Sequence, residues 1–252
     1  MPMVRSGNIN NTFFDGFYKD LWRKIVPEGL TMAETEFIVE VCSLEKNEKL
    51  LDIMCGYGRH AIQLGKRGYE ITAVDNLQDY VDDIRAVAKN ENLHIECLES
   101  DVMQMDLIKT YDAAICMGNS FSVFDYDNAI QLLLNISSHL KRGGKLIINT
   151  WMIGEIIIKD FKEKGWNYTG GYKYLVDNKY LFNPSRIESE HTLISAEGQI
   201  ETKNAIDYIF TFSEFEKMLN ESGFVVKEIF SSPKMKKYKF GDSRAYIIAE
   251  KV

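Results

Sequence analysis

Between Lys49 and Thr150 the chain alternates short apolar runs with amphipathic segments, and this alternation limits the possible fold more than any other feature. Short apolar runs are typical of buried strands, whereas apolar residues spaced about three or four apart are typical of helices. Strands that alternate with helices form parallel sheets covered by helices on both faces. We therefore expect an α/β, Rossmann-like fold, with strands at 49–54, 69–74, 93–98, 111–117 and 145–150 and helices at 59–67, 77–89 and 128–140.

The segments on either side of this alternation have other patterns. An apolar stripe at helical spacing starts at Phe14 and ends near Pro27, and Thr31 with Glu34 predicts a capping box for a second helix that reaches about residue 42. A helix at 213–221 is followed by strands at 224–230 and 244–249. These last strands predict a C-terminal antiparallel hairpin strand, so that the mostly parallel sheet is mixed.

Residues 166–210 interrupt the α/β pattern. Their β-branched and aromatic residues alternate with a period of two, and turn signals stand at Asp177-Asn178 and Glu197-Gly198. The pattern predicts a small antiparallel β insertion after the fifth strand. We expect three parts: an N-terminal helical cap (1–45), a core (46–165 and 211–252) and this insertion (166–210), which would cover the substrate site.

Charge and cysteine spacing argue against several classes of protein. The 252 residues carry a net charge of -7, which disfavours a general binder of nucleic-acid backbones. Cys42, Cys55, Cys97 and Cys116 form no C-x-x-C pair and have no histidine at ligand spacing, so we expect no metal site. The polar N-terminus has no apolar signal segment, and the most apolar stretch falls short of the roughly 20 residues that span a bilayer. We therefore expect a cytoplasmic protein that binds neither nucleic acid nor membrane.

The run from Leu51 to Ala61 follows the first expected strand and opens a helix. Gly56 and Gly58 permit a tight turn and a close approach of a nucleotide to the backbone. Asp75 ends the next strand, where it can accept hydrogen bonds from ribose hydroxyls. The glycines alone also fit a dinucleotide fingerprint, so an NAD(P)-dependent oxidoreductase is an alternative.

Asp52 distinguishes the two interpretations. A carboxylate just before this helix would repel a diphosphate but would favour the ammonium and sulfonium groups of S-adenosylmethionine. Asp52 could also simply cap the turn, because Asp often serves turns.

From about Phe13 to its C-terminus the chain resembles the class I S-adenosylmethionine-dependent methyltransferases. Residues 52–58 match their first motif, with Met54 where many members carry the first glycine. The resemblance implies that Asp75 binds the ribose, that Asn76 and Leu77 flank the adenine, and that Asp101 accepts from the adenine amine. Residues 116–121 match the segment that faces methyl transfer, and 141–144 match the turn into the fifth strand. The predicted cofactor-binding residues are Tyr18, Trp22, Asp52, Cys55, Gly56, Gly58, Arg59, His60, Asp75, Asn76, Leu77, Ser100, Asp101, Val102, Met117, Gly118, Asn119 and Phe121.

Tyr18 and Trp22 belong to an aromatic stripe that also includes Phe14 and Phe17. A stripe at this spacing is first of all a helix face packed on the core. Similar enzymes close an N-terminal aromatic segment over the methionine end of the cofactor, so Tyr18 and Trp22 are the candidates for a lid that excludes water.

The methyl acceptor and a catalytic base are less well defined. His191, Tyr126 and Asn119 are the candidate catalytic residues, and His191 should point the same way as Ile187 and Leu193 because the three share strand parity. His191 is either a hydrogen-bonded, half-buried histidine or a general base. The segment after the fourth strand is not Asn-Pro-Pro-aromatic, which disfavours adenine methylation in DNA. The sequence predicts a methyltransferase that acts on N or O of a small molecule, as a monomer or homodimer, with an RNA methyltransferase and an inactive cofactor-binding module as further alternatives.

Overall fold

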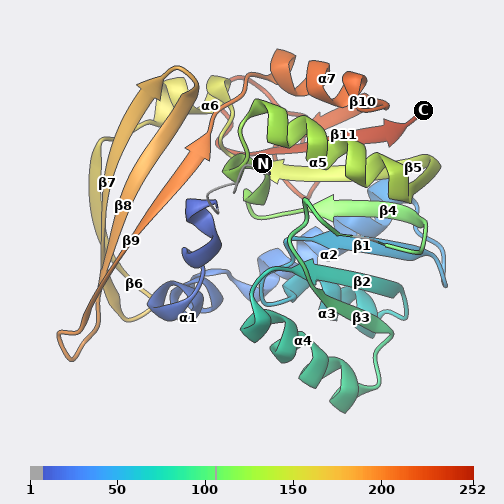
Figure 1. Cartoon of the computed structure of the whole chain (residues 1–252), viewed down its shortest axis with the longest axis horizontal. Coiled ribbons are helices and arrows are strands. Elements are labelled where there is room, and N and C mark those ends of the chain that lie inside the picture. Colours follow the sequence, from blue (N-terminus) through green and yellow to red (C-terminus); the bar gives the residue numbers. More distant parts are fainter. Residues whose placement is uncertain (1–7, 106) are drawn as a thin grey trace, which may run out of the picture.

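The computed structural model describes residues 8–105 and 107–252, and it contains a seven-stranded sheet beside a smaller four-stranded one (Figure 1). The large sheet has the order β10-β11-β5-β4-β1-β2-β3. Pairs from β3 to β5 are parallel, whereas β11 is antiparallel to both β5 and β10. The predicted α/β fold with a mixed sheet is confirmed. The strands are β1 (Lys49–Ile53), β2 (Glu70–Asp75), β3 (Ile95–Glu99), β4 (Tyr111–Cys116), β5 (Leu140–Thr150), β10 (Phe224–Phe230) and β11 (Ala245–Lys251).

Helices cover both faces of this sheet because successive strand side chains point to opposite sides. Leu51 and Ile148 pack in one core with α5 (Tyr126–His139), α6 (Gly154–Asp160) and α7 (Phe212–Glu221). Leu50 and Ile147, their neighbours in sequence, pack in the other core with α2 (Glu28–Cys42), α3 (Arg59–Lys66) and α4 (Gln78–Glu91). The sheet is therefore buried on both sides, as the near-continuous apolar runs of its strands predict.

The predicted capping box at Thr31 and Glu34 is wrong. Helix α2 already begins at Glu28, one turn earlier, after Pro27 at the N-cap position. Proline has a fixed φ suited to a helix start and no N–H to satisfy, so this residue sets the boundary. Glu34 instead lies inside the helix, fully buried, with partners on other elements.

The insertion forms an antiparallel sheet of β6 (Lys164–Thr169), β7 (Tyr172–Phe182), β8 (Ser185–Ile194) and β9 (Ile200–Tyr208). The predicted turn at Glu197-Gly198 is confirmed, since Gly198 has φ +83° and the Ser195 amide donates to the Gln199 carbonyl. The predicted turn at Asp177-Asn178 is wrong, because β7 runs on to Phe182. Asp177 pairs with Lys164 on β6, and Asn178 accepts from Ser189 on β8, so cross-strand partners use these polar side chains.

The N-terminal helices lie in two different places (Figure 1). The short η1 (Ile9–Thr12) packs along β9, and α1 (Gly16–Ile25) packs Leu21 against the insertion sheet. Helix α2 instead lies on the core, against α3. Residues 1–7 of the predicted N-terminal cap lie outside the described residues.

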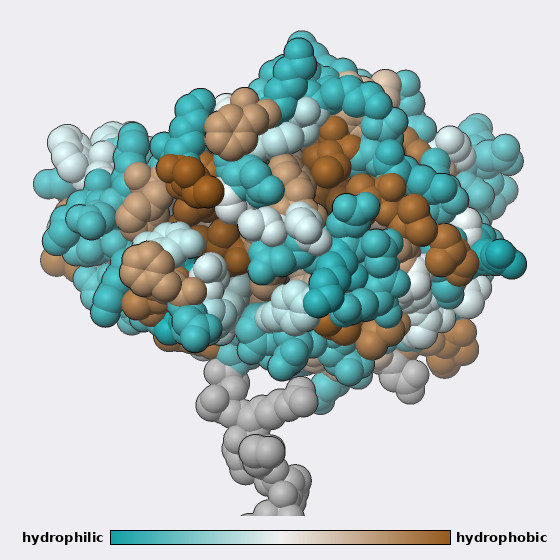
Figure 2. Space-filling view, turned by 90° about the horizontal axis from the view of Figure 1, so that it is seen from above, coloured by the Kyte–Doolittle hydropathy of each residue, from teal (hydrophilic) through white to brown (hydrophobic). Residues whose placement is uncertain are grey.

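On the face that Figure 2 shows, hydrophilic residues cover much of the surface, and hydrophobic residues form patches between them. Several of the most exposed large hydrophobic side chains belong to the insertion: Trp166, Tyr168, Phe182 and Ile200. No helix in the described part of the chain is long and apolar enough to cross a membrane.

Candidate functional site

A cavity of about 870 Å³ opens at the carboxyl ends of β1, β2 and β4. Ligands of open α/β sheets bind at this edge, where the strand order reverses. Most residues of the predicted cofactor set line the cavity: Trp22, Asp52, Cys55, Gly56, Arg59, His60, Asp75, Asn76, Leu77, Ser100, Asp101, Val102, Met117 and Gly118. Phe14 of the aromatic stripe also lines the cavity, and further lining residues that the sequence did not single out include Asn10, Tyr57, Tyr80 and Tyr208.

The glycine loop between β1 and α3 has three residues with positive φ, namely Met54, Gly56 and Gly58. A Cβ added to Gly56 would meet nothing within 4 Å, so this backbone faces open space at the cavity. A Cβ on Gly58 would lie 2.5 Å from Cγ1 of Ile84, on the α4 side. Gly58 therefore permits close packing of the loop on α4 and does not line the cavity, contrary to its predicted contact with the cofactor.

Asp75 at the end of β2 is held by the loop it faces. Its Oδ2 accepts from the Gly56 amide at 2.8 Å and its Oδ1 accepts from the Leu77 amide at 3.0 Å. Burial raises the pKa of Asp75, and these backbone hydrogen bonds oppose that rise. Each carboxylate oxygen keeps a second lone pair, so the group can still accept from a vicinal diol. This arrangement fits a ribose.

Asp52 on β1 is a buried carboxylate with an unpartnered oxygen. Its Oδ2 has no hydrogen-bond partner within the described residues, and only 1% of the residue is exposed. Burial raises the pKa of Asp52 to about 7, with the Arg59 charge opposing and the Asp75 charge reinforcing the rise. An unpaired buried carboxylate is costly, and a cationic ligand relieves that cost. The site therefore fits a ligand that brings positive charge.

The lining side chains give the cavity an acidic balance. Asp52, Asp75, Asp101, Asp125 and Asp127 face Arg59 and His60 among the described lining residues. Burial and the Arg59 charge lower the pKa of His60 to about 4, so this histidine is neutral near pH 7. A diphosphate at this loop would meet several carboxylates and one guanidinium, whereas a sulfonium would be attracted. The electrostatics favour the S-adenosylmethionine interpretation over a nicotinamide dinucleotide.

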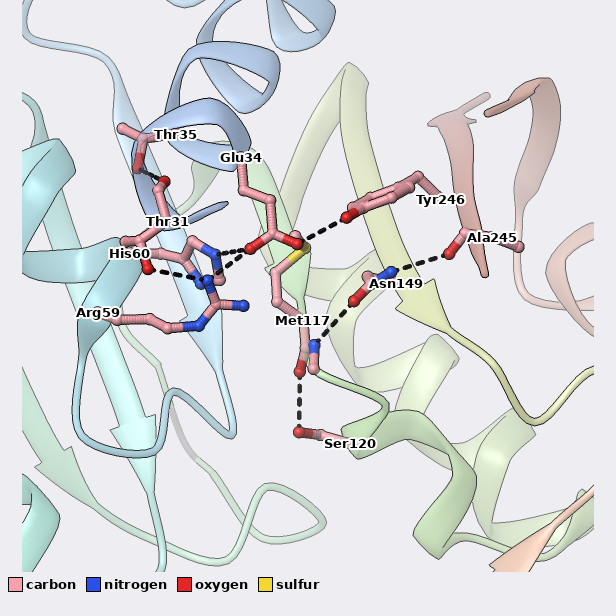
Figure 3. A network of polar contacts seen from close by, with 11 residues as sticks. Thr31, Glu34, Thr35, Arg59, His60, Met117, Ser120, Asn149, Ala245 and Tyr246 are labelled. Atoms are coloured by element: carbon pink, nitrogen blue, oxygen red, sulfur yellow. Dashed lines mark hydrogen bonds and ion pairs between the residues drawn. The ribbon is translucent and has the colours of Figure 1, made fainter. Parts of the chain in front are cut away.

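Arg59 and His60 are positioned by Glu34, as Figure 3 shows. Arg59 forms an ion pair with Glu34, and neutral His60 donates from Nε2 to the same carboxylate at 3.1 Å. Tyr246 on β11 donates to the other oxygen at 2.7 Å. Burial alone would raise the pKa of Glu34, but these three partners hold it at about 2. The sequence interpretation missed this residue because a capping-box pattern also occurs by chance inside a helix.

The aromatic side chains of α1 lie in two different environments. Trp22 lines the cavity and lies 3.9 Å from the Cβ position of Gly118. Tyr18 stacks with Trp22 at 6.3 Å between ring centroids, but it faces Tyr174 and His191 on the insertion sheet. Ion pairs of Lys19 with Asp79 and of Arg23 with Asp83 fasten α1 to α4. Helix α1 therefore closes one side of the cavity, as a lid would.

Three further predicted site residues do not line the cavity. Phe121 is fully buried in the core against Phe215, because η2 (Ser120–Val123) turns its ring inward. The ring of Tyr126 packs near Phe210, and its buried hydroxyl has no partner in the described chain. Asn119 lies behind the cavity, where its Oδ1 accepts from Thr150. Neither Phe121 nor Tyr126 is placed to touch a ligand there.

His191 on β8 faces inward with Ile187 and Leu193, as its strand parity predicts. Its Nδ1 is hydrogen-bonded to the Tyr174 hydroxyl, and its ring lies 4.7 Å from that of Phe13. Burial lowers the pKa of His191 to about 4. A histidine with so low a pKa is neutral and is a weak base near pH 7. The geometry makes it a hydrogen-bonded member of the aromatic cluster between the insertion and the N-terminal segment.

The described fold is a Rossmann-like α/β fold, and its acidic, glycine-looped cavity is suited to a nucleoside ligand with positive charge. Residues 50–144 match the family model described as a methyltransferase domain. The chain therefore contains a methyltransferase domain over these residues.

Three similar proteins illustrate the relationship. The ubiquinone biosynthesis O-methyltransferase of Rickettsia akari (strain Hartford) is 33% identical over 147 residues, which cover 54% of this chain and 57% of that protein. A crystal structure of an S-adenosylmethionine-dependent methyltransferase from Clostridium acetobutylicum ATCC 824 has a TM-score of 0.79 at 18% identity, covering 93% of this chain and 96% of that one. An amino pentose methyltransferase from Micromonospora echinaspora has a TM-score of 0.71 at 16% identity, covering 94% and 98%. The two structures share the fold.

Proposed function

We propose that this chain transfers the methyl group of S-adenosylmethionine to a nitrogen or oxygen atom of a small-molecule acceptor. The observation that carries the proposal is the unpartnered, buried Oδ2 of Asp52 at the glycine loop of an acidic cavity. When bound, the cofactor supplies a methyl group on a positively charged sulfur, which leaves as a neutral thioether when the acceptor's lone pair attacks the methyl carbon in line.

Different lining residues would bind different parts of the cofactor. Asp75 would accept from the ribose hydroxyls and Asp101 from the adenine amine. Asp52 would face the ammonium and sulfonium end, and Arg59 would pair with the cofactor's carboxylate. Trp22 would cover the methionine end and exclude water, which competes as a nucleophile. These roles rest on residue type and on position around one cavity.

The space between the core and the insertion sheet is the proposed acceptor site. Phe13 and Tyr18 from the N-terminal segment pack against Tyr174 and His191 of the insertion, with ring centroids 4.7 to 6.5 Å apart. The mostly aromatic walls suit a small molecule more than a charged polymer. Proteins similar to this chain are named as a ubiquinone biosynthesis O-methyltransferase and as a sugar N-methyltransferase, which supports both N and O as acceptor atoms.

The alternatives carry less support. A nicotinamide-dependent oxidoreductase would place a diphosphate against Asp52, and an RNA methyltransferase would need a basic surface that a net charge of -7 disfavours. That the chain is an inactive cofactor-binding module is a further alternative, which an activity assay tests. Its state as a monomer or a homodimer stays a prediction. The predicted cytoplasmic location likewise stays a prediction.

Titration calorimetry with S-adenosylmethionine, S-adenosylhomocysteine and NAD tests the proposal. We expect micromolar binding of the first two and none of NAD. A screen of small amines, phenols and sugars for release of S-adenosylhomocysteine then tests catalysis. Binding of NAD alone would overturn the assignment, and cofactor binding with no turnover on any acceptor would support the inactive module.

A further inference from the structure

The insertion sheet is joined to the core at one place, beside Asn119. The Oδ1 of Asn119 accepts from the amides of Trp151 and Met152, which begin the segment that leads from β5 to the insertion. Its Nδ2 donates to Asp207, near the end of β9, at 3.2 Å. One buried side chain therefore contacts both the outgoing and the returning segment of the insertion. Contacts gathered at one edge of a mobile unit are typical of a hinge.

The N-terminal segment 8–25 is fastened to the insertion by buried contacts. Leu21 of α1 is buried in an apolar cluster that contains Tyr172 of β7. The Asn10 side chain forms two hydrogen bonds with the backbone of Ile206 on β9, donating at 2.8 Å and accepting at 3.0 Å. Buried apolar groups and buried hydrogen bonds are costly to separate in water. We therefore treat residues 8–25 and strands β6 to β9 as one body, the clamp.

The contacts of the clamp with α4 are of another kind. Helix α1 lies between the insertion sheet and α4 (Figure 1), where Lys19 pairs with Asp79 at 3.0 Å and Arg23 pairs with Asp83. The side chains of Asp79 and Asp83 are 78% and 47% exposed. Exposed ion pairs contribute little to stability and are screened by salt. The seam between α1 and α4 is therefore easier to separate than the contact between α1 and the insertion.

The cofactor cavity lies under this seam. Phe14 and Trp22 of the clamp line the cavity, and Tyr57 and Tyr80 of the core line it as well. The Arg23 guanidinium lies 5.5 Å from the ring centre of Tyr57 and 5.8 Å from that of Tyr80. The Tyr80 hydroxyl also donates to the Phe14 carbonyl at 3.0 Å. The residues that close the seam are thus walls of the cavity or their direct neighbours, so separation of α1 from α4 would open the cavity.

We propose that the clamp rotates as one body about the Asn119 contacts, and that release of Lys19 and Arg23 from α4 gates the exchange of the cofactor. The inference concerns how the cofactor enters and leaves. It rests on the proposed function, because S-adenosylmethionine must bind in this cavity.

Two alternatives predict different behaviour. In the first, the N-terminal segment separates from a fixed insertion. Lys203 of β9 pairs with Asp15 at the N-cap position of α1, and this ion pair breaks only in that case. In the second, α1 is a static wall, and its residues act only through contact with the ligand. A gate changes the association and dissociation rates by the same factor and leaves the affinity unchanged, whereas loss of a ligand contact acts mainly on dissociation.

Surface plasmon resonance with S-adenosylhomocysteine over the immobilised full chain measures both rates. Arg23→Gln removes one ion pair and two cation–π contacts, so association and dissociation should each become about fivefold faster. The dissociation constant should stay within about twofold of the wild-type value, because the open and closed forms shift equally with and without ligand. Asp83→Asn removes the other partner of the ion pair and should accelerate both rates too.

Lys203→Gln and Lys66→Gln are the matched controls, because each removes one positive charge from another ion pair. Lys203 acts within the clamp, and Lys66 pairs with Glu91 of α4 away from the seam, so both variants should keep the wild-type rates.

Acceleration by Lys203→Gln as large as that by Arg23→Gln would overturn movement of the clamp as one body. Equal acceleration by Lys66→Gln would overturn the gate, as would an Arg23→Gln variant with unchanged rates or with faster dissociation alone. A wild type that does not bind S-adenosylhomocysteine would instead overturn the proposed function, so the two failures are distinguishable.

Discussion

The Tyr246 hydroxyl on β11 donates to Oε1 of Glu34 on α2 at 2.7 Å, across 212 positions of sequence. The other oxygen of Glu34 binds Arg59 and His60, the first two residues of α3. One buried carboxylate thus connects α2, the last strand and two residues that line the cofactor cavity. The orientation of Arg59 depends on an ion pair formed outside that cavity.

Replacement of Glu34 should therefore reduce both stability and cofactor affinity. Glu34→Gln leaves Arg59, with a side chain only 11% exposed, without its counter-ion. Loss of one partner of a buried pair costs about 3–5 kcal/mol. Tyr246→Phe is the matched control, since it removes one hydrogen bond to the same carboxylate and should cost only about 1.5–3 kcal/mol. Urea denaturation measures both, and equal losses would contradict a dominant role for the ion pair.

The Glu34 carboxylate should also make the stability of the fold depend on pH. The folded pKa of Glu34 is about 2, below its ordinary value of 4.5. Its contribution to stability is therefore complete above pH 4.5 and decreases as the pH falls toward 2. Glu34→Gln should lose less stability than the wild type over this range. Parallel acid-unfolding curves for the two proteins would show that Glu34 is not the group responsible.

Gly58→Ala should destabilise the fold by about 2–4 kcal/mol, because it adds strain at φ +75° and places a Cβ 2.5 Å from Ile84. Gly68→Ala is the control for backbone strain alone, since Gly68 has φ +89° and open space at its Cβ position. It should cost roughly 1–2 kcal/mol. The double variant Gly58→Ala with Ile84→Ala should show a favourable coupling in thermal unfolding. Strictly additive losses would mean that Ile84 does not oppose the new methyl group.

The sequence predicted the core of the fold and most of the cavity because both depend on local patterns. Strand ends that follow apolar runs place Asp52, Asp75 and Asp101 at one edge of a parallel sheet, whatever the details of packing. Residues whose role depends on packing between distant elements were missed. Nothing local marks Glu34 as the partner of Arg59, or Asp207 as the acceptor of hydrogen bonds from Ser122 and Asn119. The misplaced turn at 177–178 has the same origin, since polar turn formers also serve as cross-strand partners.

Asp75→Ala should weaken binding of S-adenosylmethionine by at least about 1–3 kcal/mol, the contribution of a hydrogen bond to a charged group. The variant loses the acceptor for the ribose and also the contacts that hold Gly56 and Leu77. Asp82→Ala, on the exposed side of α4, should leave the affinity unchanged, because Asp82 pairs only with Arg85 of the same helix in the described chain. Calorimetry checks both, and an unaltered affinity in Asp75→Ala would show that the ribose lies elsewhere.

Asp52 makes cofactor affinity sensitive to pH near neutrality. In the unliganded protein its pKa is about 7, so the carboxyl is partly protonated there. A cationic ligand favours the ionised form and lowers this pKa, so binding releases a proton and becomes tighter as the pH rises. We expect the affinity for S-adenosylmethionine to rise about tenfold from pH 6 to pH 8, as the linkage of one carboxyl with this pKa requires. Calorimetry in buffers of different ionisation enthalpy measures the released proton directly.

Asp52→Asn isolates the contribution of this carboxyl to cofactor affinity and to the pH dependence of stability. The variant should bind S-adenosylmethionine weakly, with little dependence on pH. Because the folded pKa of Asp52 exceeds its ordinary value of 3.8, the unliganded wild type loses stability as the pH rises from about 4 through 7. The variant lacks this loss and should be the more stable of the two at pH 8 when no ligand is present. A variant that binds as tightly as the wild type would show that the positive end of the cofactor does not face Asp52, whereas a less stable variant at pH 8 would show that its carboxylate is already paired.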